Sequence, residues 1–141
     1  MIRQIEKKDI EDIISLENDT IGSSLGNMLN DLILNPLMGA YVYIDKGLIG
    51  YISYTFDGDI LEILNFCVSK ECQNMGIGKK LLSYLLEDMK KKNAKSSILE
   101  VRSDNFRAIH IYEAFGYKRI SIRKNYYKDS CDALVYEKSL V

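Results

Sequence analysis

The sequence has no tryptophan, one proline and one histidine among its 141 residues. Its three cysteines, Cys67, Cys72 and Cys131, make an odd count with no C-x-x-C pair, which argues against a disulfide framework and a structural zinc site. The formal net charge is −1, so no global basic field points to a nucleic-acid partner. No apolar run approaches the roughly 18–20 residues of a membrane span, and the charged N-terminus lacks a signal-peptide core. These absences favour a soluble cytoplasmic protein with no metal, no nucleic-acid partner and no membrane partner.

What is present has the composition of a folded globular protein. Hydrophobic residues make up 47% of the chain and charged residues 28%, without any repeat or linker-like run. A chain of this length can bury one ordinary hydrophobic core. We therefore expect a single domain over residues 1–141.

The first half of the chain predicts a strand, two helices and a strand meander. A short strand is expected over residues 1–5 and a helix from about residue 10. A second helix is expected over residues 25–33, ended by Pro36 and Gly39, with an apolar stripe of Leu25, Met28, Leu29, Leu32 and Ile33. Residues 40–44, 48–56 and 60–68 are rich in aromatic and β-branched residues and are separated by turn residues, which predicts three antiparallel strands.

The second half predicts alternating helices and strands. A helix is expected with the apolar face Leu81, Leu82, Leu85, Leu86 and Met89, followed by a strand over residues 97–101. A further helix from Asn105, capped by Gly116, carries the stripe Ala108, Ile111, Tyr112 and Phe115, and strands follow over residues 117–122 and 132–140. The strand–helix–strand step implies a right-handed parallel crossover. We expect a mixed α+β fold, with about seven strands, an antiparallel N-terminal meander, a parallel centre and about four flanking helices.

The stretch QNMGIGKKLL, residues 73–82, has the character of an anion-binding loop before a helix. Closely spaced glycines let the backbone approach a ligand, and the helix dipole adds about half a positive charge at its N-terminus. A P-loop would need glycine in place of Gln73 and Ser or Thr in place of Lys80. The dinucleotide-binding fingerprint would need glycine in place of Leu81. Both nucleotide patterns fail, and a plain strand-to-helix turn stays open at this point.

The pattern that remains, Q-x-x-G-x-G followed by a basic residue, resembles the phosphate-binding signature of the GNAT N-acetyltransferases. Further blocks follow at fixed separations: LEVR-S-x-N-x-x-A-I-x-x-Y-E-x-x-G-Y, then IRKNYY, then DAL. Together they cover about residues 60–140 and are most similar to the bacterial ribosomal-protein-alanine N-acetyltransferases of that superfamily. The resemblance implies the GNAT fold and acetyl-CoA as a cosubstrate.

The resemblance also implies roles for particular residues. Glu100 is implied to be the proton acceptor, Tyr112 the proton donor, and Asn105 a contact to the coenzyme. The backbone of Phe66, Cys67 and Val68 is implied to pair with the pantetheine arm. The pyrophosphate is implied to bind the loop made of Asn74, Met75, Gly76, Ile77, Gly78 and Lys79. The variant Gly76→Val is therefore expected to weaken coenzyme binding more than folding.

The chemistry of acetyl transfer to an amine fits these roles. The attacking nitrogen must be neutral, and an α-amino group with a pKa of about 8 loses its proton far more readily than a lysine at about 10.4. A carboxylate with a raised pKa, acting directly or through a water, is an adequate base for this step. The backbone N–H of Val68 is expected to polarise the thioester carbonyl, and Tyr112 to protonate the departing sulfur. We expect direct transfer in a ternary complex.

Several alternatives stay open from the residues alone. Periodicity allows Glu100 to be a structural ion-pair partner and Tyr112 to be a core residue. A covalent relay through Cys67 or Cys72 would need an adjacent base, and the chain has one histidine. Glu62 is the alternative general base, because Glu62, Leu64 and Phe66 are expected to share one face of their strand.

The acceptor side of the sequence matches the family pattern less well. The stretch NDTIGSSLGNML, residues 18–29, stands where the related enzymes carry aromatic residues, proline and tryptophan. The acceptor implied by the resemblance is the N-terminal alanine of a ribosomal protein, with Tyr126 and Tyr127 either walling the peptide channel or simply ending a tyrosine-rich strand. A lysine side chain, a small-molecule amine, or a non-catalytic acyl-CoA-binding module are the alternatives. We expect a monomer or weak dimer.

Overall fold

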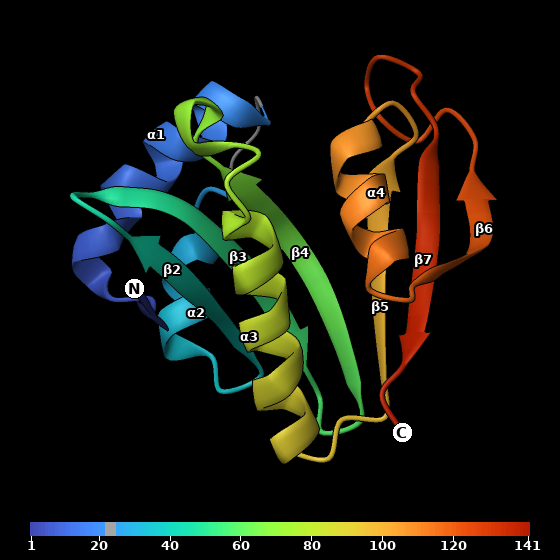
Figure 1. Cartoon of the computed structure of the whole chain (residues 1–141), viewed down its shortest axis with the longest axis horizontal. Coiled ribbons are helices and arrows are strands. Elements are labelled where there is room, and N and C mark those ends of the chain that lie inside the picture. Colours follow the sequence, from blue (N-terminus) through green and yellow to red (C-terminus); the bar gives the residue numbers. More distant parts are fainter. Residues whose placement is uncertain (22–24) are drawn as a thin grey trace.

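The computed structural model describes residues 1–21 and 25–141, which build one seven-stranded sheet with helices on both faces (Figure 1). The elements are β1 (Ile2–Gln4), α1 (Ile10–Thr20), α2 (Met28–Leu34), β2 (Met38–Ile44), β3 (Leu48–Phe56), β4 (Ile60–Val68), α3 (Ile77–Lys91), β5 (Ser96–Arg102), α4 (Phe106–Ala114), β6 (Lys118–Arg123) and β7 (Ala133–Ser139). The strand order is β1-β2-β3-β4-β5-β7-β6, with β4 and β5 parallel and the other described pairs antiparallel. The expected mixed α+β fold with a parallel centre is confirmed.

Two apolar clusters lie on opposite faces of the sheet. On one face α3 and α4 pack against the strands, and the predicted stripe of α3 is fully or almost fully buried, at Leu81, Leu82, Leu85, Leu86 and Met89. On the other face α1 and α2 cover a second cluster that includes Ile13, Leu29, Val42 and Tyr51. Each buried Leu or Ile contributes roughly 1.5–3 kcal/mol relative to an exposed one. None of the described helices is both long enough and apolar enough to cross a bilayer.

The second predicted helix is shorter than its apolar stripe suggested. α2 begins at Met28, and Leu25 lies in the preceding turn, where its carbonyl accepts a hydrogen bond from the Met28 N–H at 3.1 Å. Met28 and Ile33 are 40% and 37% exposed, because two turns of helix bury one narrow face. Gly39 does not end this helix but lies inside β2, where a Cβ atom would meet the Tyr54 hydroxyl oxygen at 2.5 Å. That glycine is needed for the close approach of the tyrosine ring.

β4 and β5 are paired over their first halves alone. Partners run from Ile60 with Ser96 to Ile63 with Leu99, although β4 continues to Val68 and β5 to Arg102. Figure 1 shows the two ribbons diverging toward the ends of these strands. The sheet therefore opens between its fourth and fifth strands.

A β-bulge lies on the other edge of β4. The register with β3 shifts between Ile52 and Tyr54, so that Leu64 and Asn65 together oppose Ser53. Past this extra residue Phe66 packs with the α3/α4 cluster, whereas Leu64 packs with the α1/α2 cluster. The prediction that Glu62, Leu64 and Phe66 share one face is wrong, because the bulge inverts the alternation of the strand.

A cluster of buried polar side chains links α1 to the sheet by hydrogen bonds beside this bulge. Glu17 is fully buried, and its Oε2 atom accepts hydrogen bonds from the Tyr51 hydroxyl and from Asn65 Nδ2 at 2.7 Å. The Leu25 N–H also donates to this oxygen, at 3.4 Å. A buried carboxylate is tolerable because its oxygens accept several hydrogen bonds.

The variant Tyr51→Phe should lower the free energy of unfolding by about 1.5–3 kcal/mol, the usual contribution of a hydrogen bond to a charged group. Urea denaturation followed by circular dichroism measures this difference. Tyr43→Phe on β2 is the matched control, because its hydroxyl has no hydrogen-bond partner in the described part of the chain. Equal losses in the two variants would show that the contact with Glu17 does not stabilise the fold.

Candidate active site

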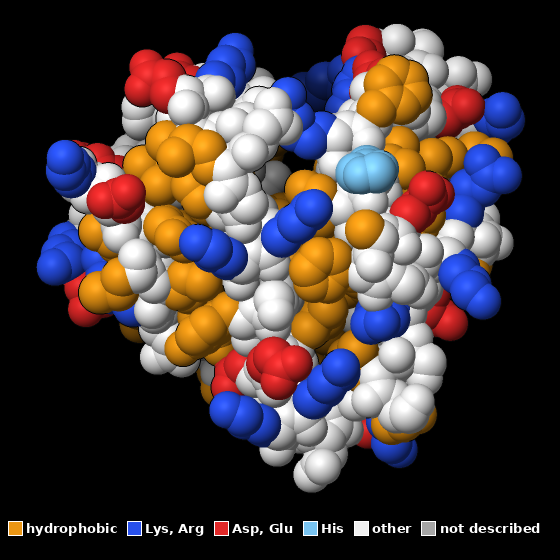
Figure 2. Space-filling model, in the orientation of Figure 1, with side chains coloured by type: hydrophobic (Ala, Val, Ile, Leu, Met, Phe, Trp, Pro, Cys, Tyr) orange, Lys and Arg blue, Asp and Glu red, His pale blue; other side chains and the backbone are white. Residues whose placement is uncertain are grey.

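An open pocket of about 1110 Å³ lies where β4 and β5 diverge. Its walls come from the end of β4, the loop before α3, and the first turns of α3 and α4. Of the predicted coenzyme residues, those lining it are Phe66, Cys67, Val68, Asn74, Gly76, Ile77, Gly78, Lys79 and Asn105. Met75 is 64% exposed and is not part of the wall. Figure 2 shows the molecular surface hollowed between the two halves of the sheet, with Lys and Arg side chains around the hollow.

The end of β4 presents its backbone to this pocket. The Ser69 N–H donates to the Ile49 carbonyl at 2.7 Å, so the backbone groups of Cys67 and Ser69 face β3. Because backbone groups alternate along a strand, the N–H and C=O groups of Phe66 and Val68 face the opposite edge of β4. At that edge the pairing with β5 has ended at Ile63. The strand therefore offers the N–H and C=O groups of Phe66 and the N–H group of Val68 to a ligand in the opening.

The loop between β4 and α3 is held in an unusual backbone conformation. Gln73 Nε2 donates to the Val68 carbonyl oxygen at 3.0 Å and so ties the loop to the strand end. Asn74 and Gly76 have φ angles of 67° and 81°, and Gly76 is the N-cap of α3. The Lys80 N–H donates the first hydrogen bond of the helix, to the Gly76 carbonyl, which leaves the N–H groups of residues 77–79 without intrahelical partners. These free N–H groups at a helix N-terminus have the geometry expected of the anion-binding loop predicted from QNMGIGKKLL.

The two glycines of the loop serve different purposes. At Gly76 a Cβ atom would meet nothing within 4 Å, so its positive φ angle is the constraint. At Gly78 a Cβ atom would lie 3.2 Å from Phe66 Cζ and 3.5 Å from Ile111 Cδ1. Gly78 therefore lets α3 pack closely between β4 and α4, a requirement that the sequence pattern did not reveal.

Positive side chains surround the pocket. Lys70, Lys79 and Arg107 all line it, and no ion-pair partner for them is found within residues 1–21 and 25–141. The acidic lining residue, Asp104, is paired with Arg102 at 3.1 Å. The pocket therefore has a net positive lining suited to phosphate groups. Sequence reasoning found Lys79 but missed Lys70 and Arg107, which come from other elements and are brought together by the fold.

Asn105 begins α4 at the edge of the pocket. Its side-chain oxygen accepts a hydrogen bond from the Ala108 N–H at 3.2 Å, which makes it the N-cap of the helix. The expected stripe of Ala108, Ile111, Tyr112 and Phe115 packs against the core, and Gly116, with φ 90°, follows the last turn. The predicted fourth helix and its cap are confirmed.

Neither Glu100 nor Tyr112 is among the residues that line the pocket, and the two lie on opposite faces of the sheet. Leu99 and Val101 are buried beneath α4, so their neighbour Glu100 projects from the other face of β5. Glu100 Oε1 lies 3.1 Å from Arg123 Nε, and the Glu100 side chain is 26% exposed. The ion pair anticipated for a carboxylate in mid-strand is present, with a partner that the sequence had not identified.

Tyr112 packs against Phe66 and is 5% exposed. Its ring centroid is 5.9 Å from that of Phe66 and 5.6 Å from that of Tyr117. Burial raises the pKa of Tyr112, so the phenol keeps its proton. The Tyr117 hydroxyl is hydrogen-bonded to Ser97 at 2.7 Å, whereas no partner for the Tyr112 hydroxyl occurs among the described residues.

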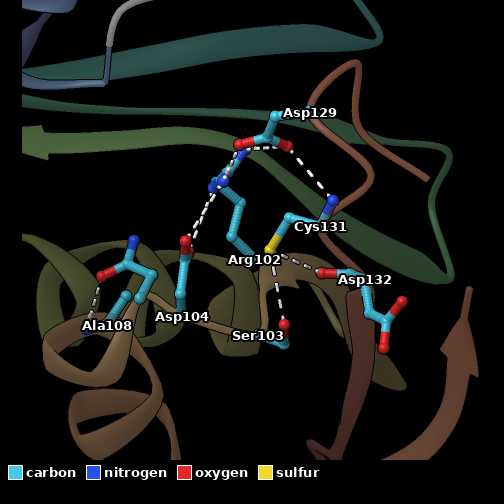
Figure 3. Close-up of polar contacts among 8 residues, drawn as sticks. Arg102, Ser103, Asp104, Ala108, Asp129, Cys131 and Asp132 are labelled. Atoms are coloured by element: carbon cyan, nitrogen blue, oxygen red, sulfur yellow. Dashed lines mark hydrogen bonds and ion pairs between the residues drawn. The ribbon is translucent and has the colours of Figure 1, made fainter. Parts of the chain in front are cut away.

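The segment after β6 contacts the end of β5 through Arg102. Arg102 bonds both Asp104 and Asp129, as Figure 3 shows, and its guanidinium lies 5.0 Å from the Tyr127 ring centroid. The rings of Tyr126 and Tyr127 are 5.2 Å apart and nearly perpendicular. These contacts hold residues 126–129 against the end of β5.

The environment of Cys67 argues against a covalent relay through that residue, whereas Cys72 lines the pocket. Cys67 is buried on the α1 side of β4, and burial raises its pKa to about 12. A thiol in that environment is not a thiolate near neutral pH. Across residues 1–21 and 25–141, no group of three or more His, Cys, Asp and Glu side chains could hold a metal ion.

From the stretch that departs from the family pattern, residues 18–29, Thr20 and Ile21 line the α1 end of the pocket. Residues 22–24 of that stretch lie outside the described residues. The prediction of a divergent acceptor side therefore stays a prediction.

Comparison with known proteins gives a consistent family match. The model of the Acetyltransferase (GNAT) family matches residues 8–117. A putative ribosomal protein bS18-alanine N-acetyltransferase of Bacillus subtilis (strain 168) is 31% identical over 139 residues, covering 95% of this chain and 91% of that protein. The ribosomal protein bS18-alanine N-acetyltransferase of Escherichia coli (strain K12) is 36% identical over 69 residues, covering 49% of this chain, so the chain matches about half (47%) of that relative's length. The crystal structure of the ribosomal-protein-S18-alanine N-acetyltransferase from Escherichia coli has the same fold, with a TM-score of 0.90, 22% identity, and coverage of 99% of this chain and 93% of that one.

Proposed function

Because the chain belongs to the GNAT acetyltransferase family, we propose that it transfers an acetyl group from acetyl-CoA to an N-terminal α-amino group of a protein. The specific acceptor we propose is the N-terminal alanine of a ribosomal protein of the bS18 type, which the names of its relatives support. The observation that best supports acetyl transfer is the opening between β4 and β5. Outward-facing backbone groups of β4, the N-terminus of α3 and basic side chains with no ion-pair partner among the described residues meet there.

The pocket fits a coenzyme with an extended arm and phosphate groups. Its volume of about 1110 Å³ lies slightly above the usual range for small-molecule sites. The N–H groups of residues 77–79, with Lys70, Lys79 and Arg107 around them, would hold the phosphates. The outward backbone N–H and C=O groups of Phe66 would pair with amide groups of the arm, as an added strand does at a sheet edge.

When bound, acetyl-CoA would supply an activated thioester. The Val68 N–H would donate a hydrogen bond to the thioester carbonyl oxygen, where negative charge develops. Glu100 would accept the proton that the amine loses as its N–C bond forms. Tyr112 would give its proton to the sulfur that is released as the C–S bond breaks. Placement of the base and the acid on opposite faces of the sheet suits an amine and a coenzyme that enter from opposite sides.

A mass-spectrometric assay tests the proposal. The protein is incubated with acetyl-CoA and two peptides, one with a free N-terminal alanine and no lysine, the other with a blocked N-terminus and one lysine. We expect the mass increase of one acetyl group on the first peptide. Modification of the second peptide alone would indicate a lysine acetyltransferase. Tight coenzyme binding without modification of either peptide would favour a binding module.

Gly76 offers a test of the loop that separates binding from folding. Valine is a poor choice here, because a β-branched residue at φ 81° strains the backbone and would affect folding as well. Gly76→Ala should instead weaken acetyl-CoA binding by about tenfold while costing about 1 kcal/mol of stability. Isothermal titration calorimetry and urea denaturation give the two values.

Gly58→Ala is the matched control for this variant. Gly58 has φ 101°, and a Cβ atom there also meets nothing within 4 Å, but it lies in the turn before β4. It should lose similar stability and keep full coenzyme affinity. If the two variants bound acetyl-CoA equally well, the loop would not be the phosphate site.

A further inference from the structure

Glu100 and Arg123 form an ion pair at the face of the sheet where the acceptor would enter. Arg123 belongs to β6 and reaches Glu100 on β5 across the intervening strand β7. In the register of that strand Glu100 stands opposite Val135 and Arg123 opposite Ala133. β7 thus places no charged side chain between the two partners.

We propose that Arg123 is a specificity-determining residue: by neutralising Glu100, it makes the cleft select amines that arrive without charge. The inference rests on the proposed function, with Glu100 as the group that takes the proton of the amine. A bare carboxylate at this position would attract ammonium ions, whereas a carboxylate already paired with a guanidinium does not.

The other charged groups near Glu100 have partners of their own. Arg102, on the same face of β5, is bonded to Asp104 and Asp129. Tyr127 lies against Arg102, and burial, with a smaller contribution from Glu100, raises its pKa, so it stays neutral. Because Arg102 is already paired and Tyr127 is neutral, the charge of Glu100 is balanced by Arg123 on β6.

β4 contributes one more charged side chain on this side. Glu62 pairs in register with Ile98, two residues before Glu100, and is exposed. Its charge has the same sign as that of Glu100 and so cannot replace the guanidinium. Arg123, 56% exposed, is therefore the cation that compensates Glu100 among the residues described, and an incoming amine meets a neutral pair.

Selection for neutral amines distinguishes an N-terminal α-amino group from a lysine side chain. At pH 7.5 about a quarter of α-amino groups with a pKa of about 8 are neutral, against about one in 800 lysine side chains at about 10.4. A site that refuses ammonium ions therefore favours an N-terminal amine by about two hundredfold from this cause alone. A site with an unpaired Glu100 would let a lysine enter charged and lose its proton inside the cleft.

The test compares kcat/KM on the two peptides of the assay above. In Arg123→Gln the preference for the α-amine peptide should fall by about fivefold, because the compensating charge 3.1 Å from Glu100 is lost and a partly exposed ion pair contributes no more than that. Arg123→Lys should retain most of the preference, since it keeps the charge. Arg119→Gln is the matched control, an exposed arginine of the same strand opposite Tyr136, and should keep the preference within about twofold because Arg119 forms no ion pair with Glu100.

The pH dependence supplies a readout that a structural role would not change. For the native protein, kcat/KM on the α-amine peptide should rise with the neutral fraction of the amine and level off above a pH of about 8. In Arg123→Gln the rise between pH 6.5 and 8 should become shallower, because the charged amine is also accepted. The same profile is expected for Arg119→Gln as for the native protein.

Two kinds of failure are distinguishable. If the native protein acetylated neither peptide, the proposed function and this inference would both be refuted. If the native protein acetylated the α-amine peptide, and Arg123→Gln kept both its preference and its pH profile, the proposed function would stand and the role of Arg123 would be refuted.

Discussion

Glu100→Gln is expected to lower kcat for acetyl transfer by about 10²–10⁴-fold, the usual contribution of a general base, while acetyl-CoA binding stays near normal. The amide has nearly the shape of the carboxylate but cannot take the proton of the amine. Glu100 lies on the opposite face of β5 from the residues that pack under α4, so the coenzyme pocket is left intact. The lost ion pair with Arg123 is largely exposed, and its loss should cost at most about 1 kcal/mol of stability.

Glu62→Gln is the matched variant for this experiment. Glu62 is an exposed carboxylate on the adjacent strand and the alternative base suggested by the sequence. Steady-state kinetics should show near-normal kcat for Glu62→Gln and a large loss for Glu100→Gln. The reverse pattern would transfer the role of the base to Glu62, and unchanged activity in both variants would remove a carboxylate base from the mechanism.

Tyr112→Phe is expected to lower kcat by about 10²-fold at unchanged stability. The residue is only 5% exposed, and no hydrogen-bond partner for its hydroxyl lies in the described part of the chain, so removal of the hydroxyl leaves no donor or acceptor unsatisfied. The aromatic packing against Phe66 and Tyr117 is kept. A large kinetic loss in a protein of native stability would identify the hydroxyl as a proton donor.

Tyr117→Phe gives the opposite pattern and serves as the control. Its hydroxyl is hydrogen-bonded to Ser97 in the core, so its removal should cost about 1–2 kcal/mol of unfolding free energy and leave kcat close to native. Urea denaturation and steady-state kinetics on the same two proteins provide both values. If Tyr112→Phe were destabilised and fully active, Tyr112 would be a core residue, as periodicity alone suggested.

Much of this fold could be predicted because its information is local. The apolar stripe of α3 and the alternation of β5 predicted which residues are buried and which faces pack, since helix and strand periods act within a few residues. The Gln73–Gly76–Gly78 spacing likewise indicated a phosphate loop, because the conformation of Gly76 is a property of neighbouring residues. The resemblance of the second half to GNAT enzymes indicated Glu100 and Tyr112 as candidate catalytic residues.

Other features depend on contacts between residues far apart in the chain. The β-bulge at Leu64 and Asn65 reverses the alternation of β4, and no pattern within that strand marks it, because a bulge is defined by the pairing with β3. The meeting of Lys70, Lys79 and Arg107 around one pocket, and of Glu100 with Arg123 across β7, arises only when separate elements pack. By itself the sequence determined the elements, the loop that would bind phosphate and the family. The tertiary structure decided which side chains surround that loop and which cation compensates Glu100, because electrostatic interactions depend on distance in space and not on separation along the chain.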